Sequence, residues 1–170
     1  MITDGMSSLT GQVGGTHYTK MGMQPFVFTL INGWDAAAHS ILKYIARHHS
    51  KNPEKGEEDL DKAIHICDIR ADIYPVNTNN KGAISLYNGR YVVPVARDAV
   101  PETCLAPIAI EAFISANELG GCEADALTFL DRWVRGGNMQ AAEHAAKART
   151  VQLAISQIIR ERYPNRKEPE

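Results

Sequence analysis

The chain has 170 residues, of which 44% are hydrophobic and 22% are charged, and its formal net charge is −2. This length and composition are typical of one globular core or of two tightly joined halves, and they argue against two widely separated domains. No strongly basic block stands out, so the broad electrostatic surface of a duplex-binding protein is missing and we predict no clear nucleic-acid interface.

The cysteine content and the absence of long apolar runs indicate a reducing compartment. The three cysteines, Cys67, Cys104 and Cys122, form no C-x-x-C pair, which argues against a disulfide framework and against a zinc site. The start of the chain lacks a basic segment followed by an apolar stretch, and no apolar run approaches the roughly 20 residues of a membrane helix. We therefore expect a cytoplasmic protein with no membrane partner.

The first structured segment is expected to span residues 25–75. Pro25 opens a short apolar helix, and Asp35 is a suitable N-cap for the amphipathic helix that follows. A polar loop then precedes a long helix that Pro75 is expected to end. This pattern predicts a unit of three helices, and the Gly/Ser/Thr-rich residues 1–24 predict a flexible arm before it.

The middle of the chain, residues 76–106, is expected to be a linker with one β-hairpin. Two short β-prone runs flank Asn88-Gly89, a pair typical of a type I′ turn, so we place the hairpin at about 83–95. A second helical unit is predicted over 107–163, and the charged residues 164–170 are expected to form a tail.

The second helical unit repeats the first at an offset of 85 residues. Eight of the 49 positions from 26 to 74 are identical at this offset, whereas about three identities are expected by chance. The identical pairs are Phe28/Phe113, Asn32/Asn117, Leu42/Leu127, Arg47/Arg132, Glu58/Glu143, Lys62/Lys147, Ala63/Ala148 and Ile73/Ile158. We predict a mostly α fold in which two related three-helix units pack together, with the hairpin between them. The alternative is that the two halves are amphipathic helical hairpins that share only the spacing of their apolar residues.

Basic residues gather near the end of the second expected helix. Lys43 and Arg47 lie four residues apart on one helical face, and Lys51 follows in the next loop. Such a cluster suits a phosphate group. Arg132, the counterpart of Arg47 in the second unit, is a further candidate phosphate ligand.

The next helix begins with acidic residues. Mg²⁺ binds carboxylate oxygens and substrate phosphate together, so Glu58 and Asp59 are candidate metal ligands beside the basic cluster. Lys62 follows Asp59 by three residues. An ordinary solvated helix has the same pattern, because acidic residues in a first turn complement the helix dipole.

Aromatic and histidine residues suggest further contacts. His17 and Tyr18 lie in the Gly-rich arm, which favours base stacking or a phosphate contact, although they could also simply hold the arm down. The pair His48-His49 has no additional ligand at metal-binding spacing, so we predict no transition-metal site there. Neither G-x-x-x-x-G-K-[ST] nor G-x-G-x-x-G occurs, which excludes the familiar nucleotide-binding loops.

Several motifs of the first unit occur in an order that is itself informative. They are Thr16-His17-Tyr18, Met23-Gln24-Pro25-Phe26, Ile41-Leu42-Lys43-Tyr44-Ile45-Ala46-Arg47, Lys51 and Glu58-Asp59-Leu60-Asp61-Lys62-Ala63. Together they resemble a family of small tailed-bacteriophage proteins that are commonly described as nucleotide kinases without a Walker A loop. In that family His-Tyr, Gln-Pro, Lys-Tyr-x-x-Arg and Asp-Leu-x-Lys-Ala follow one another. The resemblance covers about residues 16–74.

The resemblance implies a deoxynucleoside monophosphate kinase that uses ATP and Mg²⁺. The residues that match the family motif are His17, Tyr18, Lys43, Tyr44, Arg47, Asp59 and Lys62. We accordingly predict Lys43, Arg47 and Asp59 as catalytic residues, Glu58 and Asp59 as metal ligands, and His17, Tyr18, Tyr44, Lys51, Lys62 and Arg132 as ligand-binding residues.

Two departures from the family pattern bear on this prediction. Relatives often have Gly-Asn before the Ile-x-Lys-Tyr stretch, where this chain has His39-Ser40, two residues that can still donate a hydrogen bond. In the second unit Thr128 replaces Lys43 and His144 replaces Asp59. We interpret the second unit as a degenerate copy that completes the fold or covers the site.

Other functions fit the same residues. A non-catalytic protein that captures a nucleotide or a nucleotide-derived signal, for example to blunt host defence, needs the basic and aromatic groups but not the carboxylates. An all-helical nucleotide pyrophosphatase would hold Mg²⁺ on its acidic helix, and a helical assembly factor would bind no small ligand. In each case we expect a homo-oligomer, located in the host cytoplasm if the protein is phage-encoded.

Overall fold

The computed structural model describes residues 18, 20–51, 53–77, 85–87, 90–92, 106–136 and 139–166. This part of the chain is mostly helical, which confirms the expected fold class. Its helices are α2 (Pro25–Ile31), α3 (Ala36–Lys51), α4 (Gly56–Asn77), α5 (Ile110–Ala116), α6 (Cys122–Arg135) and α7 (Ala141–Arg162), with the 3-10 turn η1 (Pro53–Lys55) before α4. Within the described ranges, no helix combines the length and the apolar character needed to cross a membrane.

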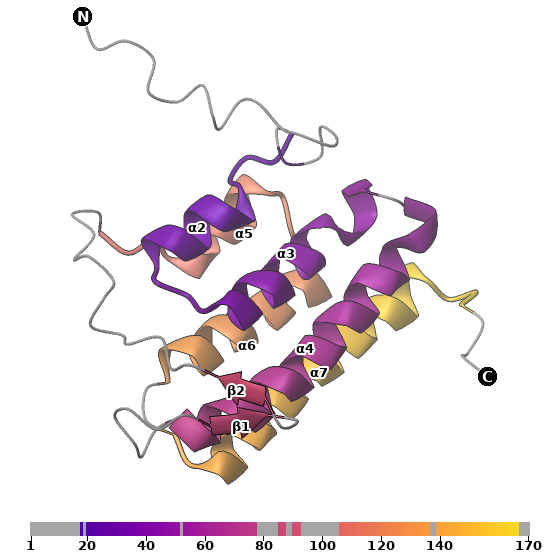
Figure 1. The fold of residues 1–170 in the computed structure, drawn as a ribbon. Coiled ribbons are helices and arrows are strands. Elements are labelled where there is room, and N and C mark those ends of the chain that lie inside the picture. The colour runs from indigo at the N-terminus through magenta and orange to yellow at the C-terminus, as the bar shows by residue number, and fades with distance from the viewer. Residues whose placement is uncertain are drawn as a thin grey trace, which may run out of the picture.

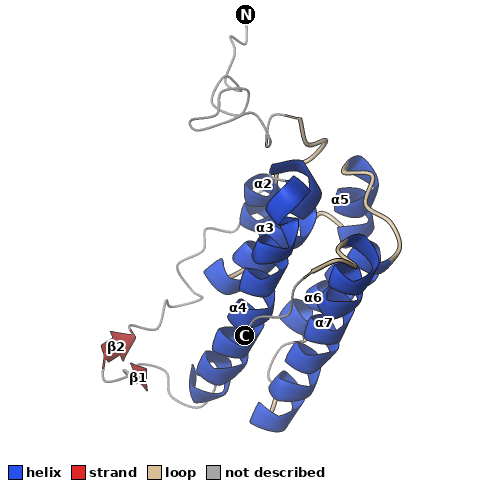
Figure 2. Ribbon diagram, turned by 90° about the vertical axis from the view of Figure 1, so that its right-hand side faces the viewer, coloured by secondary structure: helices blue, strands red, loops and turns tan. Residues whose placement is uncertain are grey.

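The four long helices pack as a bundle. α3 contacts α4 and α6, and α7 contacts the same two helices, so that each long helix has two long neighbours. The short helices α2 and α5 lie next to each other at one end of the bundle, over α3 and α6 respectively (Figures 1 and 2). The largest fully buried apolar side chains are Phe28, Ile41, Leu42, Ile45, Leu60, Phe113, Leu127, Leu130, Trp133, Ile155 and Ile158.

The contact between α2 and α5 shows why both short helices end where they do. Phe28 and Phe113 are fully buried, and their ring centroids lie 5.0 Å apart, a usual distance for an aromatic pair. Each helix ends at an asparagine whose Nδ2 donates to the phenylalanine carbonyl oxygen: Asn32 to Phe28 at 2.9 Å and Asn117 to Phe113 at 3.0 Å. These bonds satisfy carbonyl groups that a helix end leaves without a partner.

The helices of the two halves have almost the same spacing along the chain. α5, α6 and α7 begin 85, 86 and 85 residues after α2, α3 and α4. α2 packs on α3 as α5 packs on α6, and α3 packs on α4 as α6 packs on α7. Each half therefore consists of a short helix followed by a helical hairpin.

Two helix ends differ from the sequence-based prediction. α4 continues to Asn77, so the expectation that Pro75 ends it was wrong. A proline removes one backbone hydrogen bond, and near the end of a helix few further bonds depend on it. α5 begins at Ile110 rather than at Pro107, because Ala109 is extended (φ −67°, ψ 145°) and acts as the N-cap.

The described strands lie between the two halves of the chain. β1 (Ser85–Tyr87) pairs antiparallel with β2 (Arg90–Val92), with Tyr87 opposite Arg90. Residues 88–89 and the rest of the expected span 83–95 lie outside the described residues, so the type I′ turn stays a prediction. The expected arm, apart from Tyr18 and residues 20–24, and residues 167–170 of the tail also lie outside them.

Gly56, the first residue of α4, lies close to Tyr163 and to the backbone of His48. A Cβ added at Gly56 would overlap the Tyr163 hydroxyl and the backbone carbonyl oxygen of His48. We expect Gly56→Ala to lower the free energy of unfolding by about 1 to 3 kcal/mol, as overpacking does in other cores. Urea denaturation followed by circular dichroism measures this change.

Gly120→Ala is the matched control for this substitution. A Cβ at position 120 would meet no atom within 4 Å, so we expect the free energy of unfolding to change by less than about 0.5 kcal/mol. Equal effects of the two substitutions would contradict the close approach of Tyr163 to the start of α4.

Candidate functional site

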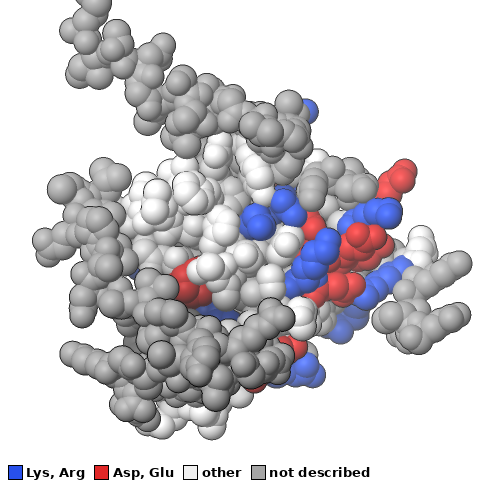
Figure 3. Space-filling model, in the orientation of Figure 1, with Lys and Arg blue, Asp and Glu red and all other residues white. Residues whose placement is uncertain are grey.

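Most of the predicted site residues that the structure describes meet between α3 and the first turns of α4. Arg47 and Asp59 are both buried, whereas Lys62 is exposed. We call this group the Arg47 cluster; its members are Tyr18, Lys43, Tyr44, Arg47, Asp59 and Lys62. In Figure 3 charged side chains gather toward the right of the view, where α3 ends and α4 begins in Figure 1.

The Arg47 guanidinium is the centre of this cluster. Its Nε donates to Asp59 Oδ2 at 2.9 Å and its Nη2 donates to Asp59 Oδ1 at 3.4 Å, which gives a two-bond contact between α3 and α4. Its Nη1 donates to the Tyr18 hydroxyl at 2.8 Å. Arg47 therefore joins the end of the N-terminal arm to both helices.

Three cations surround the ring of Tyr44. The ring centroid lies 4.7 Å from Lys43 Nζ, 4.9 Å from Arg47 Cζ and 6.0 Å from Lys62 Nζ. A tyrosine face attracts cations at these distances. The ring thus helps to hold three positive charges close together, which would otherwise repel one another.

Cations outnumber carboxylates among the named members of the Arg47 cluster. Lys43, Arg47 and Lys62 contribute three positive charges against the single carboxylate of Asp59, which also lies 3.4 Å from Lys62 Nζ. Burial alone would lower the pKa of Arg47, but its hydrogen bonds to Asp59 and Tyr18 outweigh burial and raise that pKa. Guanidinium and ammonium groups gathered in this way suit the oxygens of a phosphate group.

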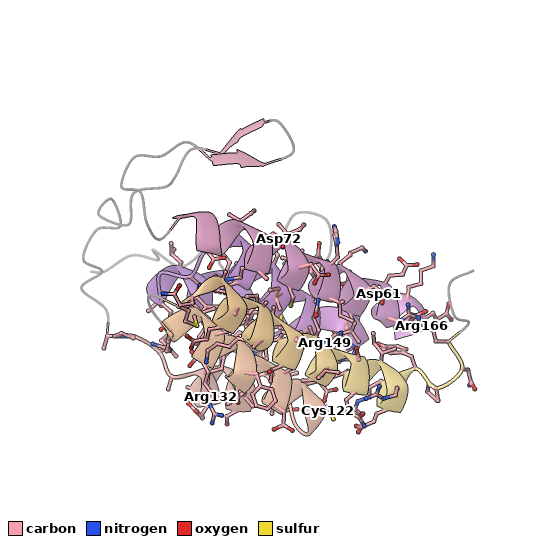
Figure 4. The ribbon with its side chains drawn as sticks, turned by 90° about the horizontal axis from the view of Figure 1, so that it is seen from below. Asp61, Asp72, Cys122, Arg132, Arg149 and Arg166 are labelled. Carbon is pink, nitrogen blue, oxygen red and sulfur yellow. The ribbon has the colours of Figure 1, made fainter. Side chains whose placement is uncertain are left out.

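The structure leaves the other predicted residues outside this group. His17 and the side chain of Lys51 lie outside the described residues. Glu58 is half exposed and pairs with Lys55 at 3.5 Å, not with the Arg47 cluster. Arg132 is exposed on α6 and lies apart from Asp61 of α4 in Figure 4.

The acidic residues at the start of α4 do not gather around one point. In the part of the chain that the structure describes, no group of three or more His, Cys, Asp or Glu side chains is arranged to hold a metal ion. Asp59, the best placed of the predicted ligands, already accepts hydrogen bonds from two cations. A metal at Asp59 would have to compete with Arg47 and Lys62.

A second polar cluster lies at the same end of the bundle. His48, which follows Arg47 on α3, is 1% exposed, and its Nδ1 lies 2.7 Å from the Tyr163 hydroxyl. Its Nε2 lies 3.6 Å from Oε1 of Glu123, a buried residue in the first turn of α6. Arg162 Nε donates to the same Glu123 oxygen at 2.9 Å. We call these four residues the His48 cluster.

Nothing in the sequence pattern predicts the His48 cluster. Its members come from α3, from the start of α6 and from the end of α7, and no spacing rule connects positions 48, 123 and 163. An ion pair of 2.7 Å between Arg166 and Asp61 holds the segment after α7 against α4 (Figure 4). Only the packing of the four long helices brings the His48 cluster together.

Comparison of the chain with known proteins found no match. No family model matches this chain, and no curated protein or solved structure matches it either. The resemblance to the phage family therefore stays a prediction that rests on the motif residues alone.

Burial of His48 makes the stability depend on pH. Burial, followed by the charge of His49, lowers the pKa of His48 to about 4, although Glu123 opposes this shift. Below pH 6.5 the unfolded chain gains a proton that the folded chain does not take up, so stability falls from pH 6.5 to about pH 4. We expect His48 to contribute a loss of about 3 kcal/mol over this range, as measured by urea denaturation at several pH values.

His48→Gln is the variant that isolates this effect. His39 and His144 also have lowered pKa values because of burial, so wild type and variant share their contributions. The difference between the two pH profiles reports His48. Parallel profiles from pH 7 to pH 4 would contradict a neutral, buried His48.

Proposed function

We propose that the Arg47 cluster binds the phosphate group of a nucleotide. The observation that carries this proposal is the convergence of three cations, Lys43, Arg47 and Lys62, on the Tyr44 ring, beside the Asp59 carboxylate that Arg47 and Lys62 contact. Charge-assisted hydrogen bonds to phosphate are among the stronger polar contacts in proteins. The phosphate oxygens would accept hydrogen bonds from these cations.

The aromatic residues favour a nucleotide over inorganic phosphate. The Tyr18 hydroxyl accepts a hydrogen bond from Arg47, and the Tyr18 ring centroid lies 6.0 Å from Arg47 Cζ. A flat base can stack on a tyrosine ring. Because cations already surround Tyr44, we assign the stacking role to Tyr18 and assign to Tyr44 the role of holding the cations.

Two activities are compatible with this ligand. The resemblance to phage nucleotide kinases implies transfer of a phosphoryl group from Mg-ATP to a deoxynucleoside monophosphate, and positioning with electrostatic stabilisation suffices for such chemistry. The pairing of Asp59 with Arg47 and Lys62 favours capture of the nucleotide without turnover. The pyrophosphatase alternative needs several carboxylates around a metal, and no described group of acidic side chains supports it.

We also infer that the two halves of the chain are copies of one unit and that only the first copy binds the nucleotide. The equivalent caps of α2 and α5 and the equal helix spacing support the duplication. In the second copy His144 stands where Asp59 stands in the first, and its Nδ1 accepts a hydrogen bond from Trp133 Nε1 at 3.1 Å. One phosphate site per chain follows from this difference.

Lys62→Gln tests the phosphate site, with Lys147→Gln as its matched control. Both lysines lie on the second long helix of their unit and pair with an acidic residue of the preceding turn. We expect Lys62→Gln to weaken binding of deoxynucleoside monophosphates about fivefold to tenfold, or roughly 1 to 1.4 kcal/mol, and Lys147→Gln to leave it unchanged. Isothermal titration calorimetry measures both. Equal losses, or no loss in either variant, would refute the assignment.

Asp59→Asn tests whether the Asp59 carboxylate binds the metal ion for phosphoryl transfer or only holds the neighbouring cations. The substitution raises the net charge of the cluster, so we expect affinity for a deoxynucleoside monophosphate to stay within about threefold or to increase. Any diphosphate formed from Mg-ATP and the monophosphate should disappear, because the variant loses its metal-binding carboxylate.

Chromatography of the reaction products, with thermal melting as the check on folding, measures this outcome. Unchanged diphosphate formation in Asp59→Asn would refute a metal-binding role for Asp59. Binding by the wild-type protein without any diphosphate would establish capture rather than transfer.

A further inference from the structure

An exposed aromatic side chain lies on α2, next to the helix that carries the Arg47 cluster. Phe26 is 61% exposed, and its ring is nearly perpendicular to that of His39 of α3, with a centroid distance of 6.1 Å. Leu30, one turn further along α2, is 60% exposed. Figure 3 shows an uncharged surface over α2 that borders basic side chains on its right. Neighbouring exposed apolar side chains, unlike a single one, indicate a surface that contacts a ligand or a partner.

His39 connects Phe26 to the Arg47 cluster. His39, Lys43 and Arg47 follow one another at intervals of four residues on α3, and side chains at this interval are neighbours on one face of a helix. At 1.5 Å per residue the three positions span about 12 Å. At the far end, the Tyr18 ring centroid lies 6.0 Å from Arg47 Cζ. This face of α3 therefore has basic side chains in its middle and an aromatic ring at each end.

The Thr29 hydroxyl fixes which ring nitrogen of His39 carries the hydrogen. Thr29 Oγ1 lies 2.9 and 3.2 Å from two backbone carbonyl oxygens of α2, which can only accept, and 2.9 Å from His39 Nδ1. The hydroxyl has one hydrogen, which it donates to a carbonyl oxygen, so Nδ1 donates to the hydroxyl and Nε2 keeps its lone pair. Burial, followed by the charge of Lys43, lowers the pKa of His39 and favours this neutral ring.

The free lone pair of His39 is accessible to a ligand. Among the described residues no hydrogen bond occupies His39 Nε2, and this atom is not buried, in contrast to Nε2 of His48. It can therefore accept a hydrogen bond from an N–H group that approaches beside the exposed Phe26 ring.

The second half of the chain has different residue types at the equivalent positions. At the offset of 85 residues, Phe26 corresponds to Glu111, His39 to Ala124 and Lys43 to Thr128. Phe26 and Glu111 are each the second residue of their helix, and both are exposed. The fold itself therefore does not require an exposed aromatic side chain at this position, which favours a role of Phe26 in binding.

We propose that Phe26 and His39 form a second base-binding surface, so that the site binds two nucleosides joined through phosphate. The phosphate lies at the basic middle of the α3 face, one base stacks on Tyr18, and the other lies against the Phe26 ring and donates an N–H to His39 Nε2. Stacking of bases on aromatic side chains tolerates any base. This inference rests on the proposed function, because the phosphate at the Arg47 cluster determines where both bases lie.

Two kinds of ligand share this chemistry. A dinucleotide would be captured as one molecule, with its linking phosphate at the basic side chains. Two mononucleotides bound for phosphoryl transfer would instead face each other through their phosphate groups, and a dinucleoside polyphosphate mimics that arrangement. The test therefore compares one probe of each kind with a mononucleotide.

Isothermal titration calorimetry on the full chain makes this comparison with deoxyadenosine monophosphate, the dinucleotide dApdA and diadenosine pentaphosphate. We expect at least one of the two-base ligands to bind at least tenfold more tightly than the monophosphate. Preference for dApdA assigns the site to a dinucleotide, and preference for the pentaphosphate alone assigns it to a pair of mononucleotides. An advantage of less than tenfold for both two-base ligands would overturn the proposal.

Phe26→Ala locates the second base, with Leu153→Ala as its control. Leu153 is 51% exposed on α7, so its substitution should change neither affinity. We expect Phe26→Ala to weaken the preferred two-base ligand at least fivefold and to leave the monophosphate within about twofold, because a single base can use Tyr18. Equal effects of Phe26→Ala on both ligands, or no effect on either, would overturn the second surface.

Failure of this inference differs from failure of the proposed phosphate site. If only the second surface is wrong, Lys62→Gln still weakens the monophosphate while Phe26→Ala has no selective effect. If the phosphate site is wrong, Lys62→Gln leaves the affinity for the monophosphate unchanged. Thermal melting establishes that each variant is folded.

Discussion

The buried ion pair between Arg47 and Asp59 is the contact that joins α3, α4 and the end of the arm. Removing two charges from water is costly, and the cost is recovered only when the pair has good geometry and its other hydrogen-bonding atoms are satisfied. Here Arg47 makes two bonds to Asp59 and a third to Tyr18, across α3, α4 and the end of the arm. Lys62 also contacts Asp59, and Lys43 lies over the Tyr44 ring, so two further cations lie beside the pair.

Arg47 and His48, which are neighbours in the last turns of α3, face different parts of the structure. Consecutive side chains leave a helix about 100° apart, so Arg47 contacts α4 while His48 contacts α6 and α7. One residue faces an exposed basic cluster, and the next lies in the His48 cluster.

The two halves have similar architecture and different polar chemistry. α3 and α4 are joined by the charged Arg47–Asp59 pair, whereas the bond from Trp133 to His144 joins α6 and α7 with neutral groups. Arg70 of α4 stacks on Trp133 of α6 at 4.3 Å and pairs with Asp35 at 3.1 Å, which ties the halves together inside the bundle.

The sequence by itself determined the mostly helical fold, because apolar residues at helical spacing dominate wherever Gly, Pro and Asn do not interrupt them. Its motif residues also named most of the Arg47 cluster, since Lys43, Tyr44, Arg47, Asp59 and Lys62 lie on two consecutive helices that a short loop must bring side by side. Only the tertiary structure decided that Asp59 is held by two cations, which depends on how α4 packs on α3. It also decided that Arg132 lies apart from this group, which depends on how α6 docks. The His48 cluster was likewise beyond the reach of sequence patterns: its members are 75 and 40 residues apart along the chain, and only helix packing makes them neighbours.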